Sequence, residues 1–275
     1  RDGSKVEINI GEDENDPVFC VTDLLIHLAT EQMQKNLAKA IKGEKLNILI
    51  GSQPLGNSDE SDLVKLNIMK LLNEKYGIVE DDFMSAEIEA VPAFKARDIG
   101  FDRSMILAYG QDDKVCALTS LFAMLEAENP ERTGCCILAD KEEIGNMGAT
   151  GMQSSFFEDM VAEVLALTGE DSPVKVRRVL RNSCMLSSDV SAAYDPLYPE
   201  VFEKKNTAYF GRGLVLNKYT GSRGKNGTSD ANAEYVAKVR NVFDNNHVAF
   251  QTAELGKVDQ GGGGTIAYVM ANKAM

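Results

Sequence analysis

The chain has 275 residues, of which 44% are hydrophobic and 26% are charged, and its formal net charge is −13. These values predict a globular protein that is long enough for one large domain or two smaller ones. The acidic balance argues against a nucleic-acid partner, because a phosphate backbone binds to a basic face. No apolar run approaches the roughly 20 residues that a membrane-spanning helix needs. The five cysteines include no C-x-x-C pair, which predicts a reduced, cytoplasmic protein.

The first 98 residues are expected to form a small α+β region. Apolar residues at alternating positions predict strands at 5–10, 45–51 and 85–92. Helical spacing of apolar residues predicts helices at 22–41 and 64–77.

From about residue 99 onward, predicted strands and helices alternate along the chain. The strands are expected at 134–139, 184–190 and 248–254. The helices are expected at 112–128, 154–169, 174–183, 231–246 and 261–275. This alternation predicts an α/β fold with a mostly parallel mixed sheet and helices on both faces. We therefore expect two domains, residues 1–98 and residues 99–275.

Five carboxylates stand at predicted strand ends or helix starts. They are Glu142 and Glu143 after one strand, Asp189 at the end of the next, and Asp112 and Asp113 at the start of a helix. Because ligands collect at the carboxyl ends of parallel strands, these side chains can meet at one edge of the sheet. A dinuclear metal site needs such carboxylates and a base for the attacking water, and zinc accepts oxygen and nitrogen ligands. The alternative is a solvated loop with helix caps, since acidic residues at helix starts complement the helix dipole.

Five segments together carry a family resemblance. They are YGQDDKVCA (109–117), DKEEIGNMGATGMQSSFFE (140–158), SSDVSAAYDP (187–196), NKYTGSRGKNGTSDANAEY (217–235) and GGGGTIA (261–267). They resemble the aspartyl aminopeptidase family, which are dinuclear zinc exopeptidases of the cytoplasm or of vacuole-like compartments. The resemblance covers nearly the whole chain. Its most specific part is the Glu-Glu-Ile-Gly block, whereas the glycine run alone would be weak.

The resemblance implies a role for each carboxylate. Asp112 matches the aspartate that bridges two zinc ions, for which cobalt or manganese would be substitutes. Glu143 and Asp189 match terminal metal ligands, and Glu142 matches the general base that takes a proton from the bridging water. Asp113 is interpreted as a helix cap.

The resemblance also implies an assembly and a cellular location. Residues 1–98 look like the family's inserted dimerisation domain, beside an incomplete zinc-exopeptidase catalytic domain at 99–275. His27 resembles a histidine that reaches into the active site of the neighbouring subunit. Without the resemblance, a lone histidine on an apolar helix would be a core or surface residue. The family implies dimers that build a hollow dodecamer, short peptides as substrates, and a cytoplasmic enzyme.

The substrate side of the site is predicted from a few basic and glycine residues. A preference for peptides with N-terminal Asp or Glu would need a cation, and Lys218, Arg223 and Lys225 are candidates. A basic surface turn is the equal alternative. Gly262 and Gly263 lie in a glycine run that lacks the Lys-Ser/Thr ending of a phosphate loop, so we interpret it as close backbone approach to the substrate.

Two histidines with which the family also binds its metals are absent from the sequence. The chain is therefore expected to lack N- and C-terminal portions of the catalytic domain. Two other functions stay open. One is an inactive oligomerising scaffold that keeps the fold without a complete metal site. The other is a different dinuclear-metal hydrolase, such as a deacylase, which would share the carboxylates but not the Lys-Tyr-Thr-Gly block.

Overall fold

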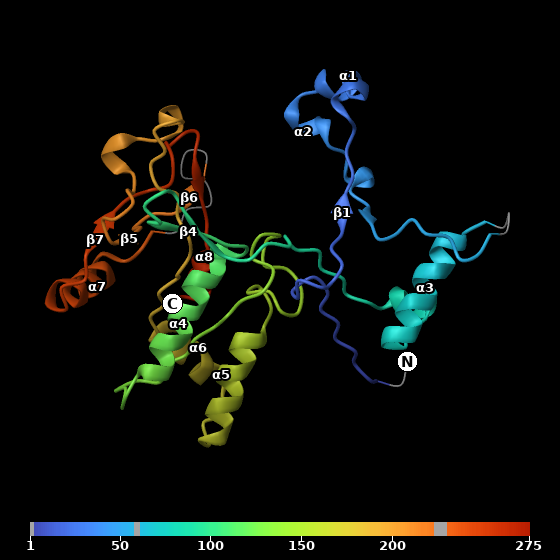
Figure 1. Cartoon of the computed structure of the whole chain (residues 1–275). Helices are drawn as coiled ribbons and strands as arrows, with labels where there is room; N and C mark the ends of the chain where they lie inside the picture. The colour runs from blue at the N-terminus through green and yellow to red at the C-terminus, as the bar shows by residue number, and fades with distance from the viewer. Residues whose placement is uncertain (1–2, 58–60, 223–229) are drawn as a thin grey trace. The chain divides into compact units, whose positions relative to one another are not determined.

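The computed structural model describes residues 3–57, 61–222 and 230–275 (Figure 1). It divides into two compact units, Arg1–Tyr109 and Gly110–Met275. The domain change expected near residue 99 falls inside the last strand pair of the first unit. The assignment of residues 1–98 as an inserted dimerisation domain stays a prediction.

The first unit contains one long helix and several very short elements. Helix α3 spans Leu63–Tyr76 and ends at Gly77, whose left-handed backbone (φ 71°) lets its N–H donate to the carbonyl of Asn73 at 2.8 Å. It confirms the helix predicted at 64–77. The other elements are β1 (Cys20–Val21), η1 (Ile26–Leu28), α1 (Thr30–Met33), α2 (Leu37–Ala40), η2 (Gly43–Lys45), β2 (Ile48–Leu49), η3 (Glu80–Met84), β3 (Arg97–Ile99) and β4 (Met105–Leu107). β1 pairs with β2, and β3 pairs with β4, both antiparallel.

The long helix predicted at 22–41 does not form. The chain makes the three separate turns η1, α1 and α2 instead, and Asn36 between the last two has an extended backbone. Leu28 and Leu37 are 71% and 88% exposed. An amphipathic helix gains most of its stability from burying its apolar stripe, and this stripe has no surface to pack on. The strands predicted at 5–10 and 85–92 are also wrong, because these residues are not assigned to any strand.

The second unit contains the helices that the sequence predicts. They are α4 (Gln111–Glu126), α5 (Phe156–Leu167), α6 (Pro173–Arg181), α7 (Ala233–Asn245) and the shorter α8 (Ala267–Ala271). Two 3-10 turns, η4 (Pro199–Val201) and η5 (Lys204–Asn206), precede the strands. No helix among the described residues is both long enough and apolar enough to cross a bilayer.

The sheets of the second unit are small. Strand β5 (Leu214–Leu216) pairs in parallel with β7 (Phe250–Thr252), and β6 (Gly221–Ser222) pairs antiparallel with β8 (Gly262–Gly263). The combination of helices and small sheets confirms the α/β class. The segments 134–139 and 184–190 are not assigned as strands, so these two predictions are wrong. A strand needs a hydrogen-bonded neighbour along its edge, and the described residues supply none beside either segment.

A core cluster lies beneath the candidate site. Met152, Val269 and Met270 are buried, and Ala139 and Met185 pack against them among other apolar residues. Ala139 precedes Glu142 by three residues, and Met185 precedes Asp189 by four. The same small core therefore supports both carboxylate segments.

Candidate metal centre

Three aspartates gather where α4 begins. Asp112, Asp113 and Asp189 each offer a carboxylate oxygen, and these oxygens all lie within 4.8 Å of one another. Gly110 precedes the helix in the left-handed region (φ 71°), and the backbone of Asp112 (φ −90°, ψ 107°) and Asp113 (φ −122°, ψ 25°) is not helical. The bent first turn brings both side chains to Asp189.

Asp113 belongs to this cluster, although its sequence position suggested a helix cap. The N-cap position of α4 is Gly110. Oδ1 of Asp113 is buried and has no hydrogen-bond partner among the described residues. A buried carboxylate oxygen without a donor costs free energy, and a nearby cation would remove that cost. The signal that could have identified Asp113 is its adjacency to Asp112 at a predicted ligand edge.

Glu142 and Glu143 lie in a tight turn after Asp140. The backbone N–H of Gly145 donates to the carbonyl of Glu142 at 2.9 Å, and that of Asn146 donates to the carbonyl of Lys141 at 2.8 Å. Asn146 adopts a left-handed backbone (φ 61°) and is only 1% exposed. The turn is therefore closed by main-chain hydrogen bonds and anchored by a buried residue.

The charges of the aspartate cluster act on the Glu142–Glu143 turn. Burial, and then the charges of Asp189, Glu143, Asp112 and Asp113, raise the pKa of Glu142 above its ordinary value. Burial also raises the pKa of Asp189, with further contributions from Asp113, Asp112 and Glu143 and an opposing hydrogen bond from a backbone N–H. All five predicted carboxylates therefore share one electrostatic environment.

The donor set of this cluster fits a divalent cation. Carboxylate oxygens suit hard divalent metals, and zinc also accepts them. The unpartnered oxygen of Asp113 and the repulsion that raises the pKa of Glu142 both favour a bound positive charge. The residues that would hold the metal are Asp112, Asp113 and Asp189, with Glu143 near them.

Cys116 stands one turn into α4, beside the cluster. Burial, followed by a hydrogen bond to Asp113, raises the pKa of the Cys116 thiol to about 11. The thiol is therefore protonated at neutral pH and donates to Asp113. All five cysteines are free thiols, as the sequence predicts.

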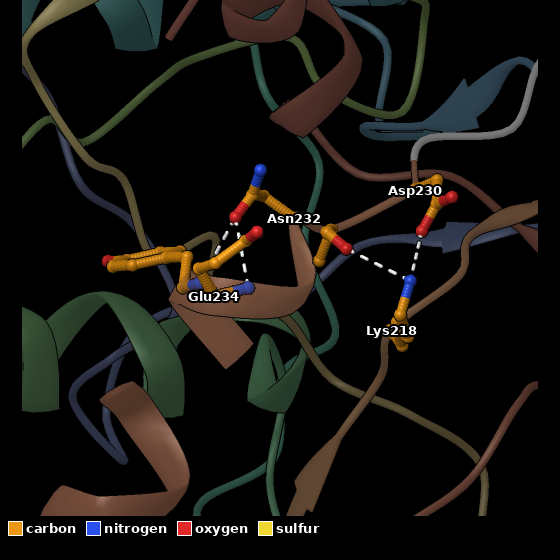
Figure 2. Close-up of polar contacts among 6 residues, drawn as sticks. Lys218, Asp230, Asn232 and Glu234 are labelled. Carbon is orange, nitrogen blue, oxygen red and sulfur yellow. Dashed lines mark hydrogen bonds and ion pairs between the residues drawn. The ribbon is translucent and has the colours of Figure 1, made fainter. Parts of the chain in front are cut away.

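Lys218 is engaged by neighbours of its own. Figure 2 shows its ammonium donating to the carboxylate of Asp230 and, at 3.0 Å, to the carbonyl of Ala231. The hydrogen bond to Asp230 is the main cause that raises the pKa of Lys218. The ammonium also lies 4.4 Å from the centre of the Tyr219 ring. Arg223 and Lys225, the other predicted cations, lie outside the described residues.

The same close-up shows how α7 begins. Oδ1 of Asn232 accepts hydrogen bonds from the backbone N–H groups of Glu234 and Tyr235 at 3.1 and 3.2 Å (Figure 2). This side chain satisfies two of the donors that the first turn of a helix leaves unpaired. It fixes the chain directly after the Lys218–Asp230 pair.

The two predicted substrate glycines form strand β8. Gly262 pairs with Ser222 and has φ 106°, a backbone conformation that favours glycine. A Cβ on Gly263 would stand 3.2 Å from a side-chain carbon of Leu255. The backbone conformation of Gly262 and the close packing at Gly263 thus account for the two glycines without a substrate, and their role in binding stays a prediction.

Neither histidine belongs to an element that carries the cluster. His27 is exposed in η1 of the first unit, and its predicted role across a subunit interface stays a prediction. His247 follows α7 with a left-handed backbone (φ 55°).

Comparison with known proteins identifies the family. A family model described as aminopeptidase I zinc metalloprotease (M18) matches residues 1–275. The chain belongs to the M18 family. A probable M18 family aminopeptidase 1 from Clostridium acetobutylicum is 61% identical over all of this chain and 59% of its own length. The crystal structure of the M18 aminopeptidase from Thermotoga maritima has a TM-score of 0.93 and 47% identity, over 99% of this chain and 60% of that chain.

A more distant solved structure shares the fold. The mApe1 dodecamer of Saccharomyces cerevisiae has a TM-score of 0.53 and 23% identity, over 81% of this chain and 50% of that chain. The chain spans about 60% of the length of its bacterial M18 relatives. Membership confirms the resemblance that the sequence motifs indicated, and the family description confirms zinc as its metal. The individual roles of the carboxylates stay predictions.

The sequence did not indicate several residues that hold the site together. Gln153, Ser187 and Tyr268 make side-chain hydrogen bonds around the carboxylate segments, as does Thr265. Ser187 and its partner Thr265 are 78 residues apart in the chain, and Gln153 and its partner Tyr268 are 115 apart. No local pattern could therefore have predicted these pairs.

Proposed function

We propose that the protein is a zinc aminopeptidase that hydrolyses the N-terminal residue of short peptides. The observation that carries the proposal is the gathering of five carboxylates at one place, three of them with oxygens within 4.8 Å of one another. Membership of the M18 zinc metalloproteases supports the reaction class. By the resemblance, Asp112, Glu143 and Asp189 would hold two zinc ions.

Glu142 is the residue that we propose moves the proton. Zinc supplies a Lewis acid that brings the pKa of a water toward neutrality. Glu142 accepts the proton of the attacking water and returns it to the leaving amine. The burial and neighbouring charges that raise the pKa of Glu142 suit this work, because a base must hold the proton during part of the reaction.

Asp113 has a supporting role in this proposal. Its Oδ1 is buried without a hydrogen-bond donor among the described residues, and its carboxylate accepts a hydrogen bond from the Cys116 thiol. We assign it to holding positive charge beside Asp112 and Asp189.

The preference for acidic N-terminal residues is a finer proposal. It rests on the resemblance and on Lys218, whose ammonium would have to be shared between Asp230 and the substrate carboxylate. Gly262 and Gly263 in strand β8 would approach the backbone of the bound peptide substrate.

A homo-oligomer is part of the same proposal. Leu25, Ile26 and Leu28 around His27 are 63–71% exposed, and exposed apolar groups of this kind are typical of subunit interfaces. A dodecamer built from dimers, with His27 donated to a neighbouring subunit, is the assembly that the resemblance implies. A cytoplasmic location is proposed from the reduced cysteines alone.

The test is a set of matched substitutions in the protein expressed from its complete gene. Glu142→Gln should keep zinc and lose at least about 100-fold in kcat, which is the usual scale of general-base catalysis. Glu143→Gln should lose zinc. Glu163→Gln, on the exposed side of α5, is the control and should change neither. Near-normal turnover of Glu142→Gln would overturn the assignment.

The same measurements separate the inactive scaffold from the enzyme. A scaffold would bind no stoichiometric zinc and would cleave no peptide with any N-terminal residue. Metal analysis by mass spectrometry, with cleavage of Asp-, Glu- and Leu-initiated peptides, decides between them.

A further inference from the structure

Two of the three segments that carry candidate metal ligands are bonded to one stretch of the chain. This stretch, here the strap, comprises residues 261–271 and contains β8, Thr265 and helix α8. One side-chain pair joins the strap to the Glu142–Glu143 turn, and a second joins it to the Asp189 segment. Neither pair includes a carboxylate of the cluster.

The first pair is Gln153 with Tyr268. Nε2 of Gln153 donates to the carbonyl of Gly145 at 2.6 Å and contacts the hydroxyl of Tyr268 at 3.2 Å. The backbone N–H of Gln153 donates to the carbonyl of Asn146 at 3.1 Å. Gln153 thus donates hydrogen bonds to two carbonyls at the end of the Glu142–Glu143 turn and connects that turn to α8.

The second pair is Ser187 with Thr265. The Ser187 hydroxyl bonds to Oγ1 of Thr265 at 2.9 Å, in a partly buried position two residues before Asp189. Oγ1 of Thr265 also accepts the backbone N–H of Ala267 at 3.2 Å, at the start of α8. Thr265 therefore fixes the beginning of α8 and the Asp189 segment with the same oxygen.

We propose that Gln153–Tyr268 and Ser187–Thr265 are positioning pairs through which the strap sets the spacing between the Glu142–Glu143 turn and the Asp189 segment. The inference rests on the proposed metal centre. The Glu142–Glu143 turn and the Asp189 segment lie outside the assigned helices and strands, unlike Asp112 and Asp113 on α4. Side-chain bonds to a common stretch, which carries the buried Val269 and Met270, supply a constraint on their spacing. Partners that orient metal ligands in this way commonly contribute 10–100-fold to metal affinity or activity.

The test compares zinc affinity, measured by calorimetry, with melting temperature. Thr265→Val keeps the shape of the side chain and removes its hydroxyl, and Ser187→Ala removes the other partner. Each should weaken zinc binding by about tenfold, and Thr265→Ser should restore it. Because both substitutions break the same bond, the double variant should be no weaker than the weaker single variant.

Tyr268→Phe tests the other pair. It should lower kcat several-fold at saturating zinc, with KM little changed, because the displaced turn carries the proposed base. Thr168→Val is the matched control, since Thr168 also loses a hydroxyl bond, to the carbonyl of Leu165, on an exposed helix end. It should leave zinc affinity and kcat unchanged.

The outcomes separate this inference from the proposed function. If the unsubstituted protein binds no zinc, the proposed centre itself fails. If the unsubstituted protein binds zinc and the Thr265 and Ser187 variants bind zinc equally well, the positioning role is overturned. This holds whether or not the variants have lower melting temperatures. Additive losses in the double variant would also overturn it.

Discussion

The two units of the chain differ in what they bury. In the first unit, Ala29 is the one buried residue among those that the structure describes. In the second, buried residues recur from Asn146 to Met270 and include the core beneath the carboxylates. The difference teaches that the proposed chemistry stands on the part of the chain with a core of its own. Exposed apolar side chains occur in both units, for example Leu37 and Leu167 at 88% each, and such groups suit an interface.

Truncation of the core should give the largest effect. Met270 is 1% exposed, whereas Leu37 in the first unit is 88% exposed. Met270→Ala should lower the free energy of unfolding by about 2–5 kcal/mol, and Leu37→Ala by at most about 0.5 kcal/mol. Denaturant unfolding measures both. Equal losses would mean that the two units do not differ in packing as described.

Zinc should stabilise the second unit selectively. At about 100 times its dissociation constant, a ligand adds about 2.7 kcal/mol to stability. Hydrogen exchange should slow around Asp112, Glu142 and Asp189 and stay unchanged in α3. Slowing in α3 of the same size would show that the metal acts on the whole chain.

Acid should act oppositely on the metal-free and the zinc-loaded protein. The folded-state pKa values of Glu142 and Asp189 lie above their ordinary values of 4.5 and 3.8. The folded state therefore binds these protons more tightly than the unfolded state. As pH falls from the raised pKa values toward the ordinary ones, protonation of these two groups increases the stability of the metal-free protein. In the zinc-loaded protein, the same protonation releases zinc. The melting temperatures of the metal-free and zinc-loaded protein should therefore converge as pH falls across that window. A constant difference between them would contradict the assignment of Glu142 and Asp189 to the metal centre.

A glycine exchange sharpens the same comparison. A Cβ on Gly151 would lie 2.3 Å from the carbonyl oxygen of Asn146, whereas a Cβ on Gly43 in the first unit meets nothing within 4 Å. Gly151→Ala should lower the free energy of unfolding by about 1–3 kcal/mol and displace the Glu142–Glu143 turn. Gly43→Ala should leave both the free energy of unfolding and the turn unchanged. Thermal melting with a zinc titration checks both. Full stability of Gly151→Ala would show that the turn is not held against Gly151.

The smallest expected effect concerns Lys218. Its pair with Asp230 is exposed, as is the pair of Lys65 with Glu80 in the first unit, and such pairs contribute little to stability because solvent screens them. Lys218→Met and Lys65→Met should therefore melt alike. If Lys218 selects acidic substrates, only Lys218→Met should lower kcat/KM for Asp-peptides relative to Leu-peptides. An equal loss for both peptides would remove Lys218 from selectivity.

The sequence predicted what local patterns control. Helices α3 to α7 follow from the helical spacing of apolar residues near one another in the chain. The long helix at 22–41 was wrong because its stripe is not buried. The strands at 134–139 and 184–190 were wrong because strands depend on neighbours distant in sequence.

The candidate site shows the same division. The adjacent acids at 112–113 and 142–143 were visible in the sequence, and they do meet in one environment with Asp189. The place of Asp113 in the cluster depends on the bent first turn of α4, which helical periodicity does not predict. The bonds of Gln153 and Ser187 to the strap depend on the tertiary fold alone.

The strap also bears on the order in which the molecule folds. Its two bonds join residues that are 115 and 78 positions apart, and contacts of such long range form slowly because a large loop must close first. On the ribosome, Asp112, Glu142 and Asp189 emerge well before Thr265 and Tyr268. The carboxylates are therefore synthesised early and brought into register late, so metal uptake belongs to the final stage of maturation.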